Sequence, residues 1–280
     1  MKVNHNLVEK IVKILLWAFT IFTLFILFFI VIFILKNGLG SLSKEFFFEY
    51  PKSMGREGGI FPIIIGTIVL TIAAVTIATP IGVGTAVYLT EYTRENRITR
   101  IIRFGADCLA GIPSIIFGLF GFVLFVIKLK MGWSIISGSL TLSFMVLPTI
   151  IRTSEEAIKA VPASYREVSY SLGATKWQTV TSVVLTNAIP GILTGIILSV
   201  GRCVGETAAV IFTAGASLNL PNSLFDSVRT MSVHFYILSR EGISMQNAYA
   251  TASVLIVSIG LINFASYWIM HRFVRKRKGE

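Results

Sequence analysis

The sequence predicts an all-α integral membrane protein with six transmembrane helices and one organised polar loop. The chain has 280 residues, of which 54% are hydrophobic and 14% charged, and its mean hydropathy is +0.77. These values lie well outside the averages for soluble domains. Six segments are apolar enough and long enough to cross a hydrocarbon core of roughly 30 Å. They are roughly Ile14–Leu35, Phe61–Leu89, Phe104–Ile127, Trp133–Ile151, Ile189–Ala214 and Ala248–Met270.

The first apolar segment, Ile14–Leu35, has two interpretations. Lysines precede it and small residues follow it, as in a cleaved signal peptide. Its 22 residues exceed the usual apolar length of a signal peptide, so we expect a retained anchor. This gives three regions. Residues 1–58 form a tail, an anchor and an outer segment; residues 59–272 form a five-span unit that includes the loop 152–188; residues 273–280 form a basic tail.

Proline and glycine interrupt the second span, at Pro62, Pro80, Gly82 and Gly84. Membrane helices tolerate such residues where neighbours satisfy the freed backbone groups. We therefore expect a bend near Thr79-Pro80 and a break before Val83–Leu89. Similar sites in the third and fourth spans are marked by Pro113 and Pro148.

The basic residues predict the orientation of the spans. Net charge is +11, which in a soluble protein would suggest nucleic acid. Basic residues also crowd the cytoplasmic ends of membrane helices. With both termini cytoplasmic, 16 basic residues of the connecting segments and tails lie inside and 8 outside, which satisfies this rule. We therefore expect a multi-pass protein of the cell membrane, in contact with lipid and not with nucleic acid.

The polar loop Ser154–Pro190 lies on the cytoplasmic side in this orientation. Pro162 is suited to the first turn of a helix, Ala163–Leu172 is good helix sequence, and Gly173 suits the position past its end. Thr175 can cap a second helix. The loop is therefore either a helix–turn–helix that docks on a partner or an amphipathic segment that packs on the bilayer.

Within the loop, Glu167 stands six residues before Gly173, and Val183-Val-Leu185 follows after nine further residues. This pattern resembles the EAA loop of ABC-importer permeases of the type I fold. Two alanines and a proline of the usual pattern are absent. The resemblance implies a coupling helix that inserts into a groove on a cytoplasmic ATPase. The residues it assigns to coupling are Tyr165, Arg166, Glu167, Ser169, Leu172 and Gly173. By their spacing Tyr165, Ser169 and Leu172 share one helix face, and Glu167 projects elsewhere.

Several further motifs, among them Leu147–Ala157, Leu172–Thr179 and Gly191–Gly195, narrow the resemblance to the A-type permease subunit of phosphate importers. This resemblance runs from about Phe61 to Met270.

Two charges, Arg202 and Glu206, interrupt the fifth apolar run. Charges at that depth are costly and mark functional sites. Their spacing of four predicts one helix face, which small and polar residues extend. Gly201–Ala208 resembles the Arg-x-x-Gly-Glu-Thr element of phosphate permeases, and sulfate and molybdate permeases have a related element. The predicted substrate pathway comprises Arg202, Glu206, Thr207, Ser199 and Thr213. In one interpretation Arg202 binds or gates an oxyanion, and in the other it forms a structural ion pair.

The sequence has no Walker-type phosphate loop, and its three histidines and two cysteines form no catalytic or metal-ligand pattern. We therefore expect a permease without enzymatic activity, cofactor or metal site. The resemblance implies an ATP-hydrolysing subunit dimer, a second, related C-type permease chain and an extracytoplasmic phosphate-binding protein as partners. The alternatives are an ABC permease for another oxyanion such as sulfate or molybdate, an ion-coupled secondary transporter that uses Glu206, and a membrane-embedded enzyme.

Overall fold

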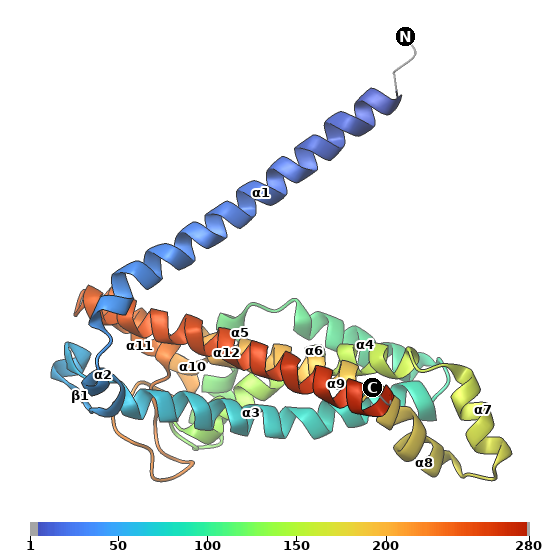
Figure 1. Cartoon of the computed structure of the whole chain (residues 1–280). Coiled ribbons are helices and arrows are strands. Elements are labelled where there is room, and N and C mark those ends of the chain that lie inside the picture. The colour runs from blue at the N-terminus through green and yellow to red at the C-terminus, as the bar shows by residue number, and fades with distance from the viewer. Residues whose placement is uncertain (1–4, 279–280) are drawn as a thin grey trace.

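Long helices that run side by side form the body of the molecule. The computed structural model describes the backbone of residues 5–278 and the side chains of residues 9–268. Helix α3 packs on α6, α6 on α9, and α9 on α12, whereas α1 projects away from this bundle (Figure 1). The long helices are α1 (His5–Gly38), α3 (Phe61–Val87), α6 (Ile135–Lys159), α9 (Leu185–Gly205) and α12 (Met245–Lys278).

In the described part of the chain, five helical stretches are long and apolar enough to cross a membrane. A sixth span exists only if a bent pair counts as one. Helix α4 (Arg97–Ala110) meets α5 (Ser114–Gly121), which continues as the π-helical η4 (Phe122–Lys128), at an angle of 104°. The predicted span Phe104–Ile127 is therefore not one straight helix but a bent pair, interrupted at the site that Pro113 was expected to mark. The cause is Pro113, because the residue before a proline is driven out of the helical conformation.

Helix α3 lacks the break that we expected before Val83–Leu89. It runs without a break from Phe61 to Val87, and Pro80 lies inside it. The α-helix then continues directly into the π-helical η3 (Tyr88–Tyr92). Pro62 stands in the first turn, where its missing N–H costs nothing. Proline inside a membrane helix is thus accommodated here without ending it.

Small residues bring α3 and α6 into close contact. A Cβ atom on Gly82 would lie 2.7 Å from Ile150 Cγ2, so only glycine fits at this crossing. Two serine hydroxyls of α6 also bond across to α3. Ser143 Oγ donates to the Ala74 carbonyl at 2.8 Å and Ser139 Oγ to the Leu70 carbonyl at 3.4 Å. Close backbone approach and hydrogen bonds between helices are what hold membrane helices together where no hydrophobic force acts between them.

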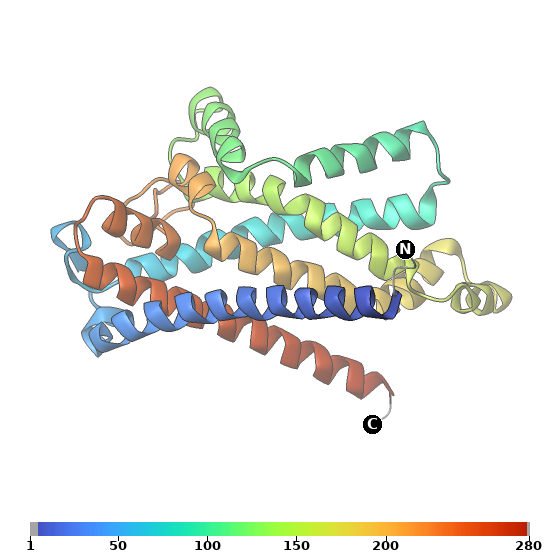
Figure 2. The same cartoon turned by 90° about the horizontal axis from the view of Figure 1, so that it is seen from above.

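Helix α1 contacts the bundle only near its end at Gly38. There Ser253 Oγ donates to the Ile34 carbonyl, and the Phe33 and Tyr249 rings meet edge to face. Elsewhere its apolar side chains are exposed, for example Phe19 at 67%. Figure 2 shows that α1 crosses over α12 in projection, while Figure 1 shows the gap that opens between them. Lipid or another chain must therefore cover α1.

Short elements close the end of the bundle at which α3 and α6 begin. Helix α2 (Lys44–Phe48) and the two-stranded hairpin β1 (Pro51–Lys52) and β2 (Glu57–Gly58) follow α1, together with the 3-10 turns η1 (Leu39–Ser41) and η2 (Ser53–Gly55). Later come α10 (Ala208–Thr213) and α11 (Met231–Arg240). We predicted a separate basic tail over residues 273–280, but α12 continues through this segment to Lys278. Residues 1–4 and 279–280 lie outside the described part of the chain.

A buried cation fixes the loop between α10 and α11. Arg229 is only 6% exposed; its Nε donates to the Ala216 carbonyl at 3.0 Å, and Nη1 lies 3.4 Å from His234 Nδ1. Burial, with the nearby Arg229 charge, lowers the pKa of His234 to about 3. Burial also lowers the pKa of Arg229. The imidazole is therefore neutral, and its Nδ1 can accept from the guanidinium.

Candidate functional sites at the loop and the broken helix

The polar loop forms the predicted helix–turn–helix. Helix α7 (Ala163–Ser171) begins directly after Pro162. The chain then turns at Gly173, whose φ of +80° is open to glycine and strained for other residues. Thr175 caps α8 (Lys176–Gln178) and makes a reciprocal capping box with Gln178. The π-helical η5 (Thr179–Val184) joins α8 to α9. Figure 1 shows α7 and α8 beyond the end of the bundle.

A buried contact of Ser169 holds α7 of the helix–turn–helix against η5. Its hydroxyl lies 2.9 Å from Thr179 Oγ1, and both side chains are buried. By contrast Tyr165 is 49% and Leu172 83% exposed. The predicted common face of Tyr165, Ser169 and Leu172 is therefore divided, because Ser169 belongs to the hairpin interior and α7 ends at Ser171, before Leu172.

Arg166 joins the loop to the end of α3. Its Nη2 and Nε lie 2.6 and 3.1 Å from Glu91 Oε1, and the guanidinium also donates to the carbonyls of Val161 and Ile158. Glu91 belongs to η3, and its side chain is only 8% exposed. Arg166 is thus tied inward rather than offered to a partner. Nothing in the sequence pairs these two residues, which stand 75 positions apart.

The tip of the helix–turn–helix carries exposed apolar side chains and an exposed carboxylate. Val168 is 60%, Leu172 83% and Trp177 67% exposed. Glu167 is exposed as well, and within the described residues no ion pair holds its carboxylate. Contiguous exposed apolar side chains beside polar groups mark interaction surfaces. We call Glu167, Val168, Leu172 and Trp177 the tip patch.

The fifth span breaks where the charges occur. Helix α9 ends at Gly205, Glu206 is extended with φ −75° and ψ +130°, and α10 begins at Ala208. One continuous helix with Arg202, Glu206 and Thr213 on a shared face was therefore a wrong prediction. The Glu206 side chain caps the new helix instead, because Oε1 accepts from the Ala209 N–H at 3.2 Å. Its backbone carbonyl accepts from Ser232 Oγ at 2.6 Å.

The predicted pathway residues separate into two groups. Arg202, Glu206 and Thr207 lie together at the break. Ser199 and Thr213 are buried, and each hydroxyl donates to a carbonyl of its own helix, at 2.8 and 2.7 Å. Arg202 is exposed, and in the described part of the chain neither Glu206 nor any other carboxylate pairs with it. The ion pair of the structural interpretation is absent from these residues.

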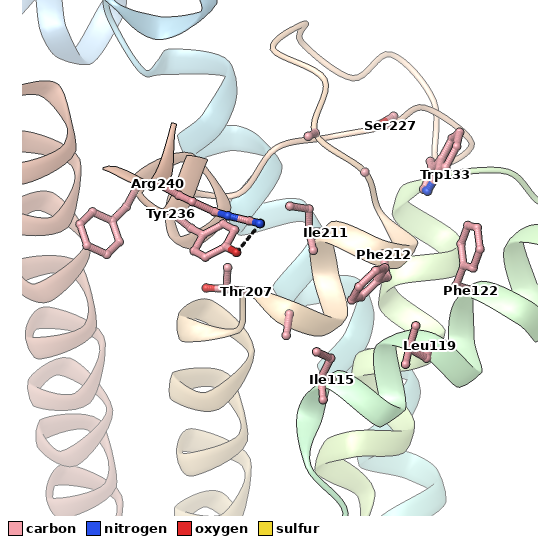
Figure 3. A pocket seen from close by; sticks show the side chains of 14 residues that line it. Ile115, Leu119, Phe122, Trp133, Thr207, Ile211, Phe212, Ser227, Tyr236 and Arg240 are labelled. Carbon is pink, nitrogen blue, oxygen red and sulfur yellow. Dashed lines mark hydrogen bonds between the residues drawn. The ribbon is translucent and has the colours of Figure 1, made fainter. Parts of the chain in front are cut away.

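A cavity of about 1020 Å³ opens beside the break (Figure 3). Thr207 and α10 form one wall, α5 and η4 a second, and α11 a third. Two lining residues were missed by our sequence analysis, Tyr236 and Arg240. Their spacing of four on α11 was the available signal, since such residues are neighbours on a helix. Among the described side chains, no cluster of three or more His, Cys, Asp or Glu could hold a metal ion.

Comparison with known proteins gives the class. Residues 78–279 match the family described as binding-protein-dependent transport system inner membrane component, and the chain belongs to that family. It is thus a multi-pass permease subunit of an ABC importer.

Individual relatives and solved structures agree with this class. The probable ABC transporter permease protein YqgI of Bacillus subtilis strain 168 is 34% identical over 254 residues, which cover 85% of this chain and 86% of that protein. The phosphate transport system permease protein PstA 1 of Mycobacterium tuberculosis strain CDC 1551 / Oshkosh is 37% identical, with coverage of 79% and 73%. The bacterial alginate ABC transporter shares the fold at a TM-score of 0.71 and 14% identity, over 94% and 95% of the two chains.

Proposed function

We propose that this chain forms half of the translocation pathway of an ATP-driven importer for inorganic phosphate. The observation that carries the proposal is the broken fifth span with an uncompensated guanidinium, Arg202, next to it. Support for the cargo comes from relatives named as phosphate transport permeases at 37% and 36% identity.

The chemistry of Arg202 suits a phosphate oxyanion. A guanidinium stays charged at depth and offers a planar fork of N–H donors that matches two oxygens of a phosphate. Glu206 would repel the same anion if its carboxylate faced the pathway. Instead that carboxylate accepts from the Ala209 N–H near the start of α10, which directs it to the helix end. Discontinuous helices of this kind form substrate sites in other transporters.

The helix–turn–helix of α7 and α8 supplies the contact with the subunit that hydrolyses ATP. In this proposal the tip patch docks on a cytoplasmic ATP-binding subunit dimer, which alone holds and hydrolyses ATP. Both termini then lie in the cytoplasm. The exposed apolar surface of α1 is covered by lipid and by the second permease chain. An extracytoplasmic phosphate-binding protein delivers the substrate to the opposite face.

The cargo is tested by uptake of labelled phosphate, sulfate and molybdate into proteoliposomes that contain the complete importer. We expect ATP-dependent uptake of phosphate, and its loss in Arg202→Gln with normal assembly. Arg94→Gln is the matched control, because Arg94 is also exposed and lies outside the spans. Uptake of only sulfate or molybdate would replace phosphate as the substrate. Uptake without the ATPase would point to a secondary transporter.

The coupling assignment is tested by charge reversal at the tip patch. Glu167→Lys is expected to abolish ATP-driven uptake while the protein remains in the membrane, and Glu167→Gln to lower it less. Full transport and normal co-purification with the ATPase in Glu167→Lys would contradict docking through this patch.

A further inference from the structure

The cavity beside α10 is mostly apolar, and three of its polar side chains, Thr207, Tyr236 and Arg240, lie on one side. Most of its lining residues are aliphatic or aromatic, such as Leu119, Phe122 and Ile211. Figure 3 shows Arg240 and Tyr236 on the side of Thr207, and Trp133 and Phe122 on the opposite side. A mostly apolar cavity with a few convergent polar groups is the usual form of a small-ligand site.

Arg240 brings a positive charge to this cavity without a matching carboxylate. Its Nη1 donates to Tyr236 Oη at 2.8 Å, and its Cζ lies 5.5 Å from the centre of the Tyr236 ring. Within the described part of the chain, no ion pair forms at Arg240. Glu241 follows directly, but adjacent helical residues do not face each other. Of the five N–H donors of a guanidinium, the one bonded to Tyr236 is the only one with a protein acceptor among these residues.

Two hydroxyl groups can donate hydrogen bonds to the same ligand. Tyr236 Oη accepts from Arg240, so its own proton is free to donate outward. The Thr207 hydroxyl lines the cavity, and it has no hydrogen-bond partner within the described residues. A guanidinium and two hydroxyls provide donors and no fixed negative charge, and the exposure of Tyr236 and Arg240 leaves these donors open to a ligand that enters from outside.

We propose that Arg240, with Tyr236 and Thr207, binds a phosphate-type oxyanion in this cavity, at a site separate from Arg202. The proposal rests on the function proposed above for Arg202 and adds a second anion site on α11. Arg202 does not line the cavity, so the two arginines act at different places. The same chemistry would bind inorganic phosphate on its way through the pathway or the phosphate of a lipid headgroup.

The test compares three variants of the complete importer in proteoliposomes, each checked for its amount in the membrane. Arg240→Gln removes the charge, Tyr236→Phe removes only a hydroxyl, and Lys128→Gln removes an exposed charge outside the cavity. A hydrogen bond to a charged group corresponds to a change of about tenfold or more. We expect uptake at limiting phosphate to fall about tenfold in Arg240→Gln, to fall less in Tyr236→Phe, and to stay unchanged in Lys128→Gln.

A second measurement separates the two sources of the oxyanion. Phospholipid that co-purifies with each variant is quantified by mass spectrometry. A loss of uptake with unchanged phospholipid supports inorganic phosphate as the ligand. Loss of a bound phospholipid with unchanged uptake supports a lipid headgroup. If Arg240→Gln and Tyr236→Phe change neither quantity, the site is refuted, while the phosphate function stands on its own wild-type assay. If the wild-type importer transports another oxyanion, the proposed phosphate function is refuted, and the Arg240 site is then tested by uptake of that anion in the same variants.

Discussion

Removal of the Arg166 side chain should separate ATP hydrolysis from transport. Arg166→Ala deletes the bonds that join α7 to Glu91 and to the carbonyls at the end of α6. It also leaves the Glu91 carboxylate, 8% exposed, without its partner. Breaking a buried ion pair by removing one member costs about 3–5 kcal/mol. Because the Arg166 side chain is 20% exposed, we take the lower limit, about 3 kcal/mol.

A loss of this size lowers the equilibrium constant for joining α7 to η3 by roughly a hundredfold, at 1.4 kcal/mol for each factor of ten. The assay is the number of phosphate ions imported per ATP hydrolysed by the reconstituted importer. We expect this ratio to fall strongly in Arg166→Ala while the ATPase stays bound through the tip patch. Arg152→Ala is the control, because Arg152 and its partner Asp107 are 54% and 51% exposed. Exposed pairs contribute only about 0–1 kcal/mol.

The double variant Arg166→Leu with Glu91→Leu makes the argument sharper. Replacing both members of a buried pair by apolar residues is often neutral, so this variant should recover part of the ratio that Arg166→Ala loses. An unchanged ratio in Arg166→Ala, or a double variant that loses as much as the sum of its single variants, would refute the reasoning.

Three further outcomes follow from local geometry. Neutral His234 stabilises the fold fully above pH 6.5, and this contribution is lost as the pH falls towards its folded pKa of about 3. The free energy of unfolding of the purified protein should therefore fall by up to about 1.4 kcal/mol per pH unit below pH 6, and His234→Asn should reduce this dependence on pH. An equal dependence in the two proteins would contradict this. Gly195→Ala places a methyl group against Thr153 and should cost about 1–3 kcal/mol, whereas Gly84→Ala meets no neighbour; equal melting temperatures would exclude the contact. Glu206→Ala removes the cap of α10 and should cost about 0.5–2 kcal/mol, with lower uptake; wild-type melting would show that the cap is dispensable.

The sequence predicted features that depend on local chemistry. The loop between α6 and α9 has its helix, its Gly173 turn and its Thr175 cap as expected, because each depends on a few neighbouring residues. The fifth span was misjudged for the opposite reason. Its hydropathy is continuous, but Gly205 and the competition of the Glu206 side chain for the Ala209 amide end the helix.

Contacts between distant segments could not be predicted from spacing. Glu91 and Arg166 meet only because α3 and α6 end side by side. Arg240 reaches the cavity only because α11 folds back beside α10. In both cases a residue that looks like an ordinary surface charge in the sequence acquires its role from packing.

The close packing of α3 on α6 affects how far a movement of α7 is transmitted through the molecule. A pair joined by glycine contacts and hydrogen bonds between the helices resists internal sliding, so we expect it to swing as one lever. One end of the pair holds Glu91. About 36 Å away, by the helical rise of 1.5 Å per residue, Thr67 Oγ1 accepts from the Met231 N–H at the start of α11. A displacement of α7 is therefore expected to reach α11, which carries Arg240, and in the functions proposed above this links the docking of the ATPase to the binding of the anion.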